Sequence, residues 1–524
     1  MRTSLRSLVL IASIATIAVP LRAEDAAATG FKPIVSTIDL KDGDTLVFLG
    51  DSITHQCLYT QYVEDFFYTR YPQMRLHFHN AGVGGDRAKN ALDRFDEDVA
   101  AFKPKYVTIL LGMNDGAYRD FDKAVFDTYQ QDMNTALDKI AAIGAIAVPM
   151  TPTMHDARAA RIANHTQEPR DTYYNGVLAL YGGWLREQAQ VRGLGFVDMY
   201  GPLNNVTFAQ RKKIANWTMI GDAVHPGQTG QVVMAAAVID DMIARSQVSA
   251  ITIQEKDGKL TGNAGRGLGF VDMYGPLNNV TFAQRKKIAN WTMIGDAVHP
   301  GQTGQVVMAA AVIDDMVARS QVSAITIQEK DGKLTGNAGR GKVTDLQGGE
   351  TIRFTHTATA LPWVLPPDAA EGYALSKAGH RFSMEKITVR NLKPGKYEMK
   401  IDGQAAGQWM DGQFATGVEL EANDKTPQYQ QALKVALLNK DRNEQAYHPL
   451  RDQWAQLKGK RRDIEKLTQA NDPQLDGKKA DFDQWHTAMK AKVAELLAKA
   501  KEFEDRIYAT NQPQPHTYEI TLVK

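Results

Sequence analysis

The feature that most constrains the fold is a regular alternation of strand-like and helix-like segments between residues 45 and 246. Short apolar runs such as residues 45–49 (TLVFL) and 106–111 (YVTILL) indicate buried strands. Segments with apolar residues three or four apart, such as 121–143, indicate helices. This alternation predicts a doubly wound parallel sheet between helices, with functional loops at the carboxyl ends of its strands. The other expected strands are 75–79, 145–150 and 195–197, and the other expected helices are 58–71, 87–102, 171–190 and 229–246.

The pattern changes after Ser320 to short strand-like runs separated by turn dipeptides such as Asp331-Gly332 and Pro394-Gly395. Such runs predict a small β-sandwich within residues 321–524. Thr426-Pro427 is a plausible helix start, and it opens a helical insertion at about 427–508. The apolar stripe in the second half of this insertion predicts a helical hairpin that packs on itself or on the sandwich.

A long tandem repeat interrupts the chain. Residues 193–266 recur almost unchanged as 267–340, and the two copies differ only at Ile243 and Val317. Solenoid repeats diverge in sequence and come in threes or more. The pair therefore indicates a recent duplication, or an error in the recorded sequence, rather than a repeat architecture. We treat residues 247–320 as the remainder of this duplication.

Residues 1–23 have the pattern of a secretory signal peptide. Arg2 and Arg6 precede the apolar run 8–20, and Ala23 offers a small residue for cleavage. The run is shorter than the ~20 residues that a transmembrane helix needs. We therefore expect a secreted or periplasmic protein without a transmembrane segment. The one cysteine, Cys57, leaves no internal disulfide or cysteine-built metal site, and we expect it to be buried.

The net charge argues against a polyanionic partner. The chain has 61 Lys+Arg and 60 Asp+Glu, which gives a net charge of +1 and no global field that would attract nucleic acid. The basic run 458–462 (KGKRR) is therefore interpreted as a solvated helix face. His77 and His79 share one face of an expected strand, where ordinary packing is preferred to metal binding, and His55 is expected to line the mouth of a cleft.

Polar motifs follow the first three strands and precede the last helix. LGDSIT at 49–54 places Ser52 at a strand end, where it could also simply cap the next helix. NAGVGGD at 80–86 brings glycines that let a backbone approach a ligand closely, and GMND at 112–115 adds the Asn114 amide. DAVHP at 222–226 places a carboxylate and an imidazole three residues apart. Together these groups could supply a nucleophile, a base, an orienting acid and oxyanion donors.

With these four motifs in this order, residues 42–246 resemble the SGNH hydrolases, also called the GDSL esterase family. The resemblance implies a flavodoxin-like three-layer α/β/α domain with a parallel sheet. It also implies Ser52 as nucleophile, His225 as base and Asp222 as the residue that orients His225. The N–H groups of Ser52 and Gly85 and the amide of Asn114 would form the oxyanion hole. The sandwich with its helical insertion resembles the accessory region of some secreted bacterial members.

The duplication supplies a second candidate base, because Asp296 and His299 repeat Asp222 and His225. One active site needs one base within hydrogen-bond reach of Ser52. The helix that ends near residue 192 runs directly into the first copy, and short connections are the commoner topology. We therefore prefer His225. The second copy remains the alternative, because it continues natively into the C-terminal region.

The resulting expectation is a secreted serine ester hydrolase that needs no metal or organic cofactor. The resemblance, export and an accessory β-domain favour deacetylation of a carbohydrate, with a lipid or peptidoglycan ester as an open alternative. The rival hypothesis is a non-catalytic carbohydrate-binding or surface protein whose base is displaced by the duplication.

Overall fold

The computed structural model describes residues 35, 38–159, 170–242, 250–256, 259–265, 321–330, 333–375 and 378–523. Its N-terminal half is built on a parallel sheet with strand order β2-β1-β3-β4. The strands are β1 (Thr45–Gly50), β2 (His77–Gly82), β3 (Tyr106–Leu110) and β4 (Ile146–Pro149). The strand expected at 195–197 is present as one parallel bridge between Met150 and Val197. This order, with its reversal between β1 and β3, confirms the doubly wound α/β architecture.

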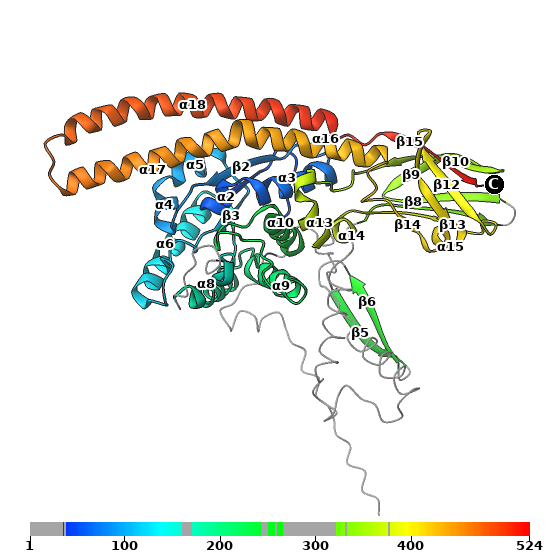
Figure 1. Ribbon diagram of the computed structural model, residues 1–524, viewed down its shortest axis with the longest axis horizontal. Helices are drawn as coiled ribbons and strands as arrows, with labels where there is room; N and C mark the ends of the chain where they lie inside the picture. Colours follow the sequence, from blue (N-terminus) through cyan, green and yellow to red (C-terminus); the bar gives the residue numbers. More distant parts are fainter. Residues whose placement is uncertain are drawn as a thin grey trace, which may run out of the picture.

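Helices flank this sheet (Figure 1). The helix expected at 87–102 is divided into two short helices and the 3-10 turn η1 (Ala100–Phe102), because Arg94 leaves helical geometry with φ −118° and ψ 4°. The Arg94 guanidinium turns inward there and binds Asp86 and Asp98. The helices are α2 (Ser52–His55), α3 (Leu58–Arg70), α4 (Ala88–Asp93), α5 (Phe95–Asp98), α6 (Lys123–Ala142), α8 (Arg170–Arg192), α9 (Tyr200–Arg211) and α10 (Gln228–Met242).

The C-terminal half contains the predicted β-sandwich. One sheet has the order β13-β12-β15-β10-β9 and the other the order β14-β11-β7-β8. Buried side chains from both sheets, among them Phe354, Ile387 and Met399, form a core separate from that of the α/β domain. The strands are β7 (Gln321–Lys330), β8 (Lys333–Gly339), β9 (Gly341–Gln347), β10 (Thr351–Ala358), β11 (Met384–Val389), β12 (Lys396–Ile401), β13 (Gln404–Met410), β14 (Val418–Glu419) and β15 (Pro515–Leu522). The helices η2 (Pro367–Ala369), α13 (Ala370–Leu375), α14 (Ala378–Phe382) and α15 (Asp411–Thr416) lie between them in the sequence.

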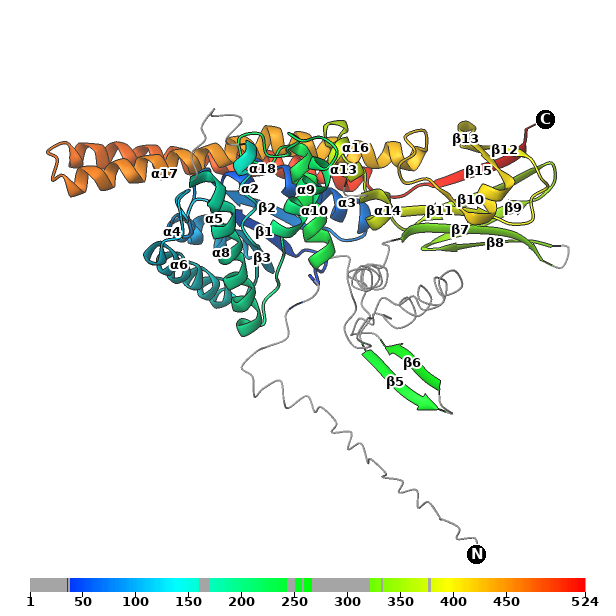
Figure 2. The ribbon, with the colours of Figure 1, turned by 60° about the horizontal axis from the view of Figure 1, so that its bottom comes forward.

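The helical insertion consists of α16 (Pro427–Arg442), the π-helical segment η3 (Asn443–Tyr447), α17 (His448–Gln469) and α18 (Leu475–Thr510). The expectation that it packs on itself or on the sandwich is confirmed in its first form, because buried side chains of α17 and α18, such as Trp454 and Met489, share one cluster. The insertion also packs on the α/β domain, which was not expected. Figures 1 and 2 show α17 and α18 side by side along the α/β domain. Arg442 donates to Glu64 Oε2 (3.1 Å) and Arg451 donates to both oxygens of Asp98 (2.8 Å each), and all four side chains are buried. Helical periodicity in the sequence cannot show such pairs, which fix the insertion on the α/β domain.

The segment that follows the first sandwich strands also joins the α/β core. Trp363 is 1% exposed, packs edge-on against Phe66 and donates its indole N–H to the backbone oxygen of Tyr62 (3.1 Å). Cys57 is a free buried thiol, as expected. None of the helices in the described ranges is long and apolar enough to cross a membrane.

The two copies of the duplicated segment contribute different parts of the fold. The first copy supplies α9 and α10 of the α/β domain, followed by the hairpin β5 (Ala250–Lys256) and β6 (Lys259–Gly265). The second copy supplies the identical hairpin β7–β8, which pairs in the same register from Ala324 to Gly339 and is built into the sandwich through β11. The β5–β6 hairpin is a separate two-stranded sheet (Figure 2).

A buried carboxyl group in the sandwich makes stability depend on pH. Glu385 on β11 is 3% exposed, and burial, reinforced by the charge of Glu421, raises its pKa from 4.5 to about 8. The native state therefore keeps this proton up to about pH 8, whereas the unfolded chain releases it near pH 4.5. Between these values the native state binds more protons, so the free energy of unfolding falls as the pH rises.

We predict that Glu385→Gln removes this loss. The melting temperature at pH 9 should rise by roughly 2–4 °C or more relative to the wild type, and the difference should vanish near pH 4.5. Thermal unfolding followed by circular dichroism across this range measures both values. Glu350→Gln, at an exposed position of the same domain, serves as the control. Parallel pH curves for Glu385→Gln and the wild type would contradict the prediction.

Candidate active site

Ser52 stands at the first position of α2, directly after the end of β1. Asp51 caps this short helix, because its Oδ1 accepts from the Ile53 N–H at 2.9 Å. The helix is pressed against the strand ends at two glycines. A Cβ atom on Gly50 would lie 2.1 Å from Thr54 Oγ1, and one on Gly82 would lie 2.3 Å from the backbone nitrogen of His55. Glycine at the ends of β1 and β2 therefore lets α2 bring Ser52 to the edge of the sheet.

A histidine and an aspartate from the loop before α10 complete a chain of hydrogen bonds to Ser52. His225 Nε2 lies 2.8 Å from Ser52 Oγ, and His225 Nδ1 lies 2.7 Å from Asp222 Oδ2. The other oxygen of Asp222 accepts from the N–H groups of Val224 (3.0 Å) and His225 (2.8 Å). These contacts hold the carboxylate under the imidazole. The arrangement of serine, imidazole and carboxylate is one that can activate a hydroxyl group as a nucleophile.

Within the hydrogen-bonded series Ser52–His225–Asp222, the carboxyl group of Asp222 stays ionised. Partial burial raises the pKa of Asp222, but the hydrogen bonds from the backbone and ring of His225 outweigh it and bring the pKa below its usual value of 3.8. Asp51, behind Ser52, behaves in the opposite way. Its burial is almost complete and raises its pKa to about 7, with Asp115 and Asp86 adding to the effect. An ionised Asp222 can stabilise positive charge on His225, whereas Asp51 serves as a buried helix cap.

The candidate oxyanion donors Gly85 and Asn114 follow β2 and β3. Gly85 has φ +68°, a conformation that favours glycine. Asn114 Nδ2 donates to the backbone oxygen of Asp86 (3.0 Å) and to Asp51 Oδ2 (3.4 Å), so the two loops meet next to the residue that precedes Ser52. The O–H of Tyr118 donates to Asn114 Oδ1 at 2.9 Å and orients the amide. Tyr118 has φ +53°, and nothing in the sequence indicated this role.

Buried charges hold the loop that carries Gly85. Asp86 accepts from Arg94 Nε (2.9 Å), and the same guanidinium donates to Asp98 (2.6 Å) and to the backbone oxygen of Gly50 (3.2 Å). His55 lies on the other side of the loop, where its Nδ1 accepts from the Gly84 N–H at 3.2 Å. Burial lowers the pKa of His55 to about 4, so the ring is neutral and can accept this bond. His55 thus supports the loop.

The remaining sequence candidates have different outcomes. Asp296 and His299 lie outside the described residues, so the structure places only the first copy, Asp222 and His225, at Ser52. His79 is buried and bonded to Asp98, as ordinary packing predicts, and His77 lies beside Glu504. The solvated-face interpretation of 458–462 is wrong for two members. Lys458 and Arg461 donate to the backbone oxygens of Gly84 and Asp93, because α17 packs on the α/β domain.

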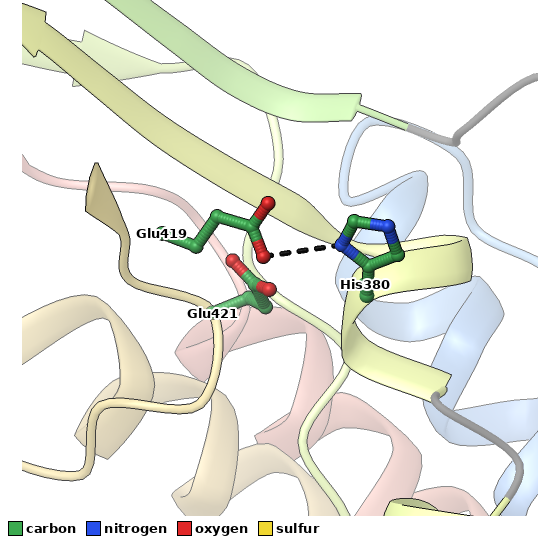
Figure 3. A group of neighbouring side chains, drawn as sticks. All are labelled: His380, Glu419 and Glu421. Carbon is green, nitrogen blue, oxygen red and sulfur yellow. Dashed lines mark hydrogen bonds and ion pairs between the residues drawn. The ribbon is translucent and has the colours of Figure 1, made fainter. Parts of the chain in front are cut away.

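One group of side chains elsewhere in the described chain has the donor types of a cation site. His380, Glu419 and Glu421 bring their ligand atoms within 4.8 Å of one another in the C-terminal half (Figure 3). His380 Nδ1 is already bonded to Glu419 Oε2 at 3.1 Å. Burial, together with the charge of Glu419, raises the pKa of Glu421 to about 7. A proton held by Glu421 near neutral pH, while Glu419 stays ionised beside His380, therefore accounts for the approach of the two carboxyl groups.

Comparison with known proteins agrees with this geometry. Residues 48–233 match the GDSL-like lipase/acylhydrolase family. An acetylxylan esterase from Geobacillus stearothermophilus is 26% identical over 223 residues, which cover 38% of this chain and 94% of that enzyme. The solved structure of a gut microbial diltiazem-metabolizing enzyme superimposes with a TM-score of 0.69 at 21% identity. It covers 93% of this chain and 99% of its own, so the likeness of fold extends beyond the α/β domain.

The fold and the matched motifs define the N-terminal half as an acyl-hydrolase domain of the α/β class. More specifically, residues 48–233 match the GDSL-like lipase/acylhydrolase family, and with the acetylxylan esterase relative this match shows a carboxylic ester hydrolase.

The hydrogen bond between Asp222 and His225 gives a first test of the site. We predict that Asp222→Asn lowers kcat by roughly 10²–10⁴-fold, because an amide can neither fix the imidazole tautomer nor stabilise its positive charge. KM should change little, since Asp222 orients His225 and does not bind substrate. Steady-state hydrolysis of a chromogenic acetyl ester measures both constants. A variant with full kcat and intact fold would show that Asp222 does not orient the base.

Proposed function

We propose that this chain is a secreted carbohydrate O-acetyl esterase in which Ser52 is the nucleophile and His225 is the general base. The contact of 2.8 Å between Ser52 Oγ and His225 Nε2 is the observation that carries the proposal. Asp222 orients His225, and the N–H groups of Ser52 and Gly85 with the amide of Asn114 form the oxyanion hole.

The reaction proceeds in two steps, acetylation of Ser52 and hydrolysis of the acetyl-enzyme. Ser52 Oγ attacks the ester carbonyl while His225 takes its proton, and the carbonyl oxygen becomes an oxyanion held by the amide donors. The tetrahedral intermediate collapses, His225 protonates the departing sugar oxygen so that it leaves as a hydroxyl group, and acetyl-Ser52 remains. Water then attacks this ester with His225 again as base, His225 returns that proton to Ser52 Oγ, and acetic acid leaves and ionises in water.

The substrate class rests on the acetylxylan esterase relative and on the accessory sandwich. The proposal of export rests on the signal-peptide pattern of residues 1–23. An exported enzyme could reach a polymeric substrate outside the cytoplasm. Among carboxylic esters, a lipid or peptidoglycan ester is the alternative. The rival hypothesis of a non-catalytic carbohydrate-binding protein requires that the base is displaced from Ser52. The contact between His225 and Ser52 argues against this hypothesis.

We predict that Ser52→Ala lowers the release of acetate from acetylated xylo-oligosaccharides by at least about 10⁴-fold, because the nucleophilic oxygen is lost. A labelled fluorophosphonate should react with the wild type at Ser52 and leave the variant unlabelled, as mass spectrometry of the peptide can show. Retained hydrolysis by the variant would refute the serine mechanism. Failure of the wild type to react would favour the non-catalytic rival, and hydrolysis confined to long-chain esters would favour a lipid substrate.

We predict that deletion of residues 247–320 preserves activity. The deletion joins Ser246 to Gln321 and so restores the single-copy sequence, and it removes Asp296 and His299 but leaves Asp222, His225 and the β7–β8 hairpin. Within the full chain, His225→Ala should lower kcat roughly 10²–10⁴-fold and His299→Ala less than about twofold. An inactive but folded deletion variant, or equal losses from the two alanine variants, would show that the second copy takes part.

A further inference from the structure

Lys458 belongs to the basic run 458–462 on α17. Among the contacts that the structure describes for this run, only those of Lys458 reach the loop that carries Gly85. Lys458 Nζ donates to the backbone oxygen of Gly84 at 3.0 Å and forms an ion pair with Asp86 Oδ1 at 2.9 Å. A Cβ atom on Gly85 would lie 3.6 Å from the same Nζ, so the ammonium lies directly against this glycine. Lys458 is far outside residues 48–233, which match the hydrolase family.

The chemistry of the contact follows from the peptide group that it touches. The carbonyl of Gly84 and the N–H of Gly85 belong to one amide. A charged donor at the carbonyl oxygen draws electron density from the amide nitrogen, so its N–H becomes a stronger donor. The contact also fixes the direction of that N–H, since Gly84 and Gly85 have no side chains that could hold the loop.

We propose that Lys458 is a positioning residue for ester hydrolysis, which aims and polarises the Gly85 N–H toward the oxyanion. This inference rests on the proposed function, in which Gly85 is an oxyanion donor. Lys458 touches neither substrate nor reacting atoms, and it acts through the Gly84–Gly85 peptide. The helical insertion thereby becomes part of the catalytic apparatus.

Lys458→Met tests the inference, because methionine keeps an unbranched side chain and removes the charge. Asp86 stays paired with Arg94 in this variant, so the fold should survive. We expect kcat for acetyl-ester hydrolysis to fall roughly 5–50-fold, less than for deletion of an oxyanion donor, with KM changed less than about twofold. The Ki of a boronic acid, which forms a tetrahedral adduct with Ser52, should rise in parallel with the loss of kcat.

Two further variants separate positioning from mere anchoring. Lys458→Arg keeps the charge and should recover most of kcat. Arg461→Met removes a cation from the next turn of α17 that binds Asp93 and Glu97, and it should leave kcat within about twofold. All rates are taken per active site, titrated with a fluorophosphonate, so that unfolded protein does not count as lost catalysis.

The outcomes are distinct from those that test the proposed function. If Lys458→Met keeps kcat per titrated site within about twofold, or if KM rises and kcat does not fall, the positioning role is overturned. An equal loss in Arg461→Met would overturn it as well, because it would show a general effect of α17 docking. Ser52→Ala and labelling of the wild type decide the serine mechanism independently, with Lys458 unchanged.

Discussion

The structure depends on a buried cluster of ion pairs around Asp98. Asp98 is fully buried and accepts from Arg94, from Arg451 of α17 and from His79. Burial alone would raise its pKa, but the two guanidinium groups and the hydrogen bond from His79 hold that pKa well below the usual value. Removing one partner from such a cluster leaves an uncompensated buried charge, which typically costs about 3–5 kcal/mol. The cluster therefore fixes the helical insertion on the α/β domain in one position.

This fixed position determines what the insertion can contribute to the site. Lys458 follows Arg451 by two helical turns on α17, so the pair that fixes Arg451 also brings Lys458 to the Gly84 carbonyl. Arg94 acts from the other side, since the same guanidinium binds Asp98 and Asp86. The loop that carries Gly85 is thus held between two cations from different parts of the chain. A glycine loop can approach a ligand closely, and for the same reason it needs support from its neighbours.

The alternation of strand-like and helix-like segments predicted the α/β sheet, and the resemblance to the SGNH hydrolases implied that Ser52, Asp222 and His225 meet. Parallel strands bring their carboxyl ends to one edge, so motifs after β1, β2 and β3 had to converge there. The place of the insertion was not predictable, since Arg442, Arg451 and Lys458 resemble any surface cations on a helix. Their partners are carbonyls and carboxylates hundreds of residues away, and one sequence carries no sign of that pairing. The break between α4 and α5 at Arg94 was missed for the same reason.

The tandem repeat of residues 193–266 as 267–340 allows the effect of local sequence on the fold to be compared with that of tertiary context. β5–β6 and β7–β8 have the same sequence and register, so the hairpin is specified locally by its strands and turn. One of them pairs with β11 in the sandwich, whereas the other forms a sheet of its own. The copy that joins the sandwich is the one that continues directly into β9, which follows β8 after Arg340. The same logic applies at the other end, where α8 leads into the first copy and thus brings His225 to Ser52. The first copy thus supplies the helices of the α/β domain that it follows, and the second copy supplies the strands of the sandwich that it precedes. Extra residues between these two parts can therefore leave both domains intact.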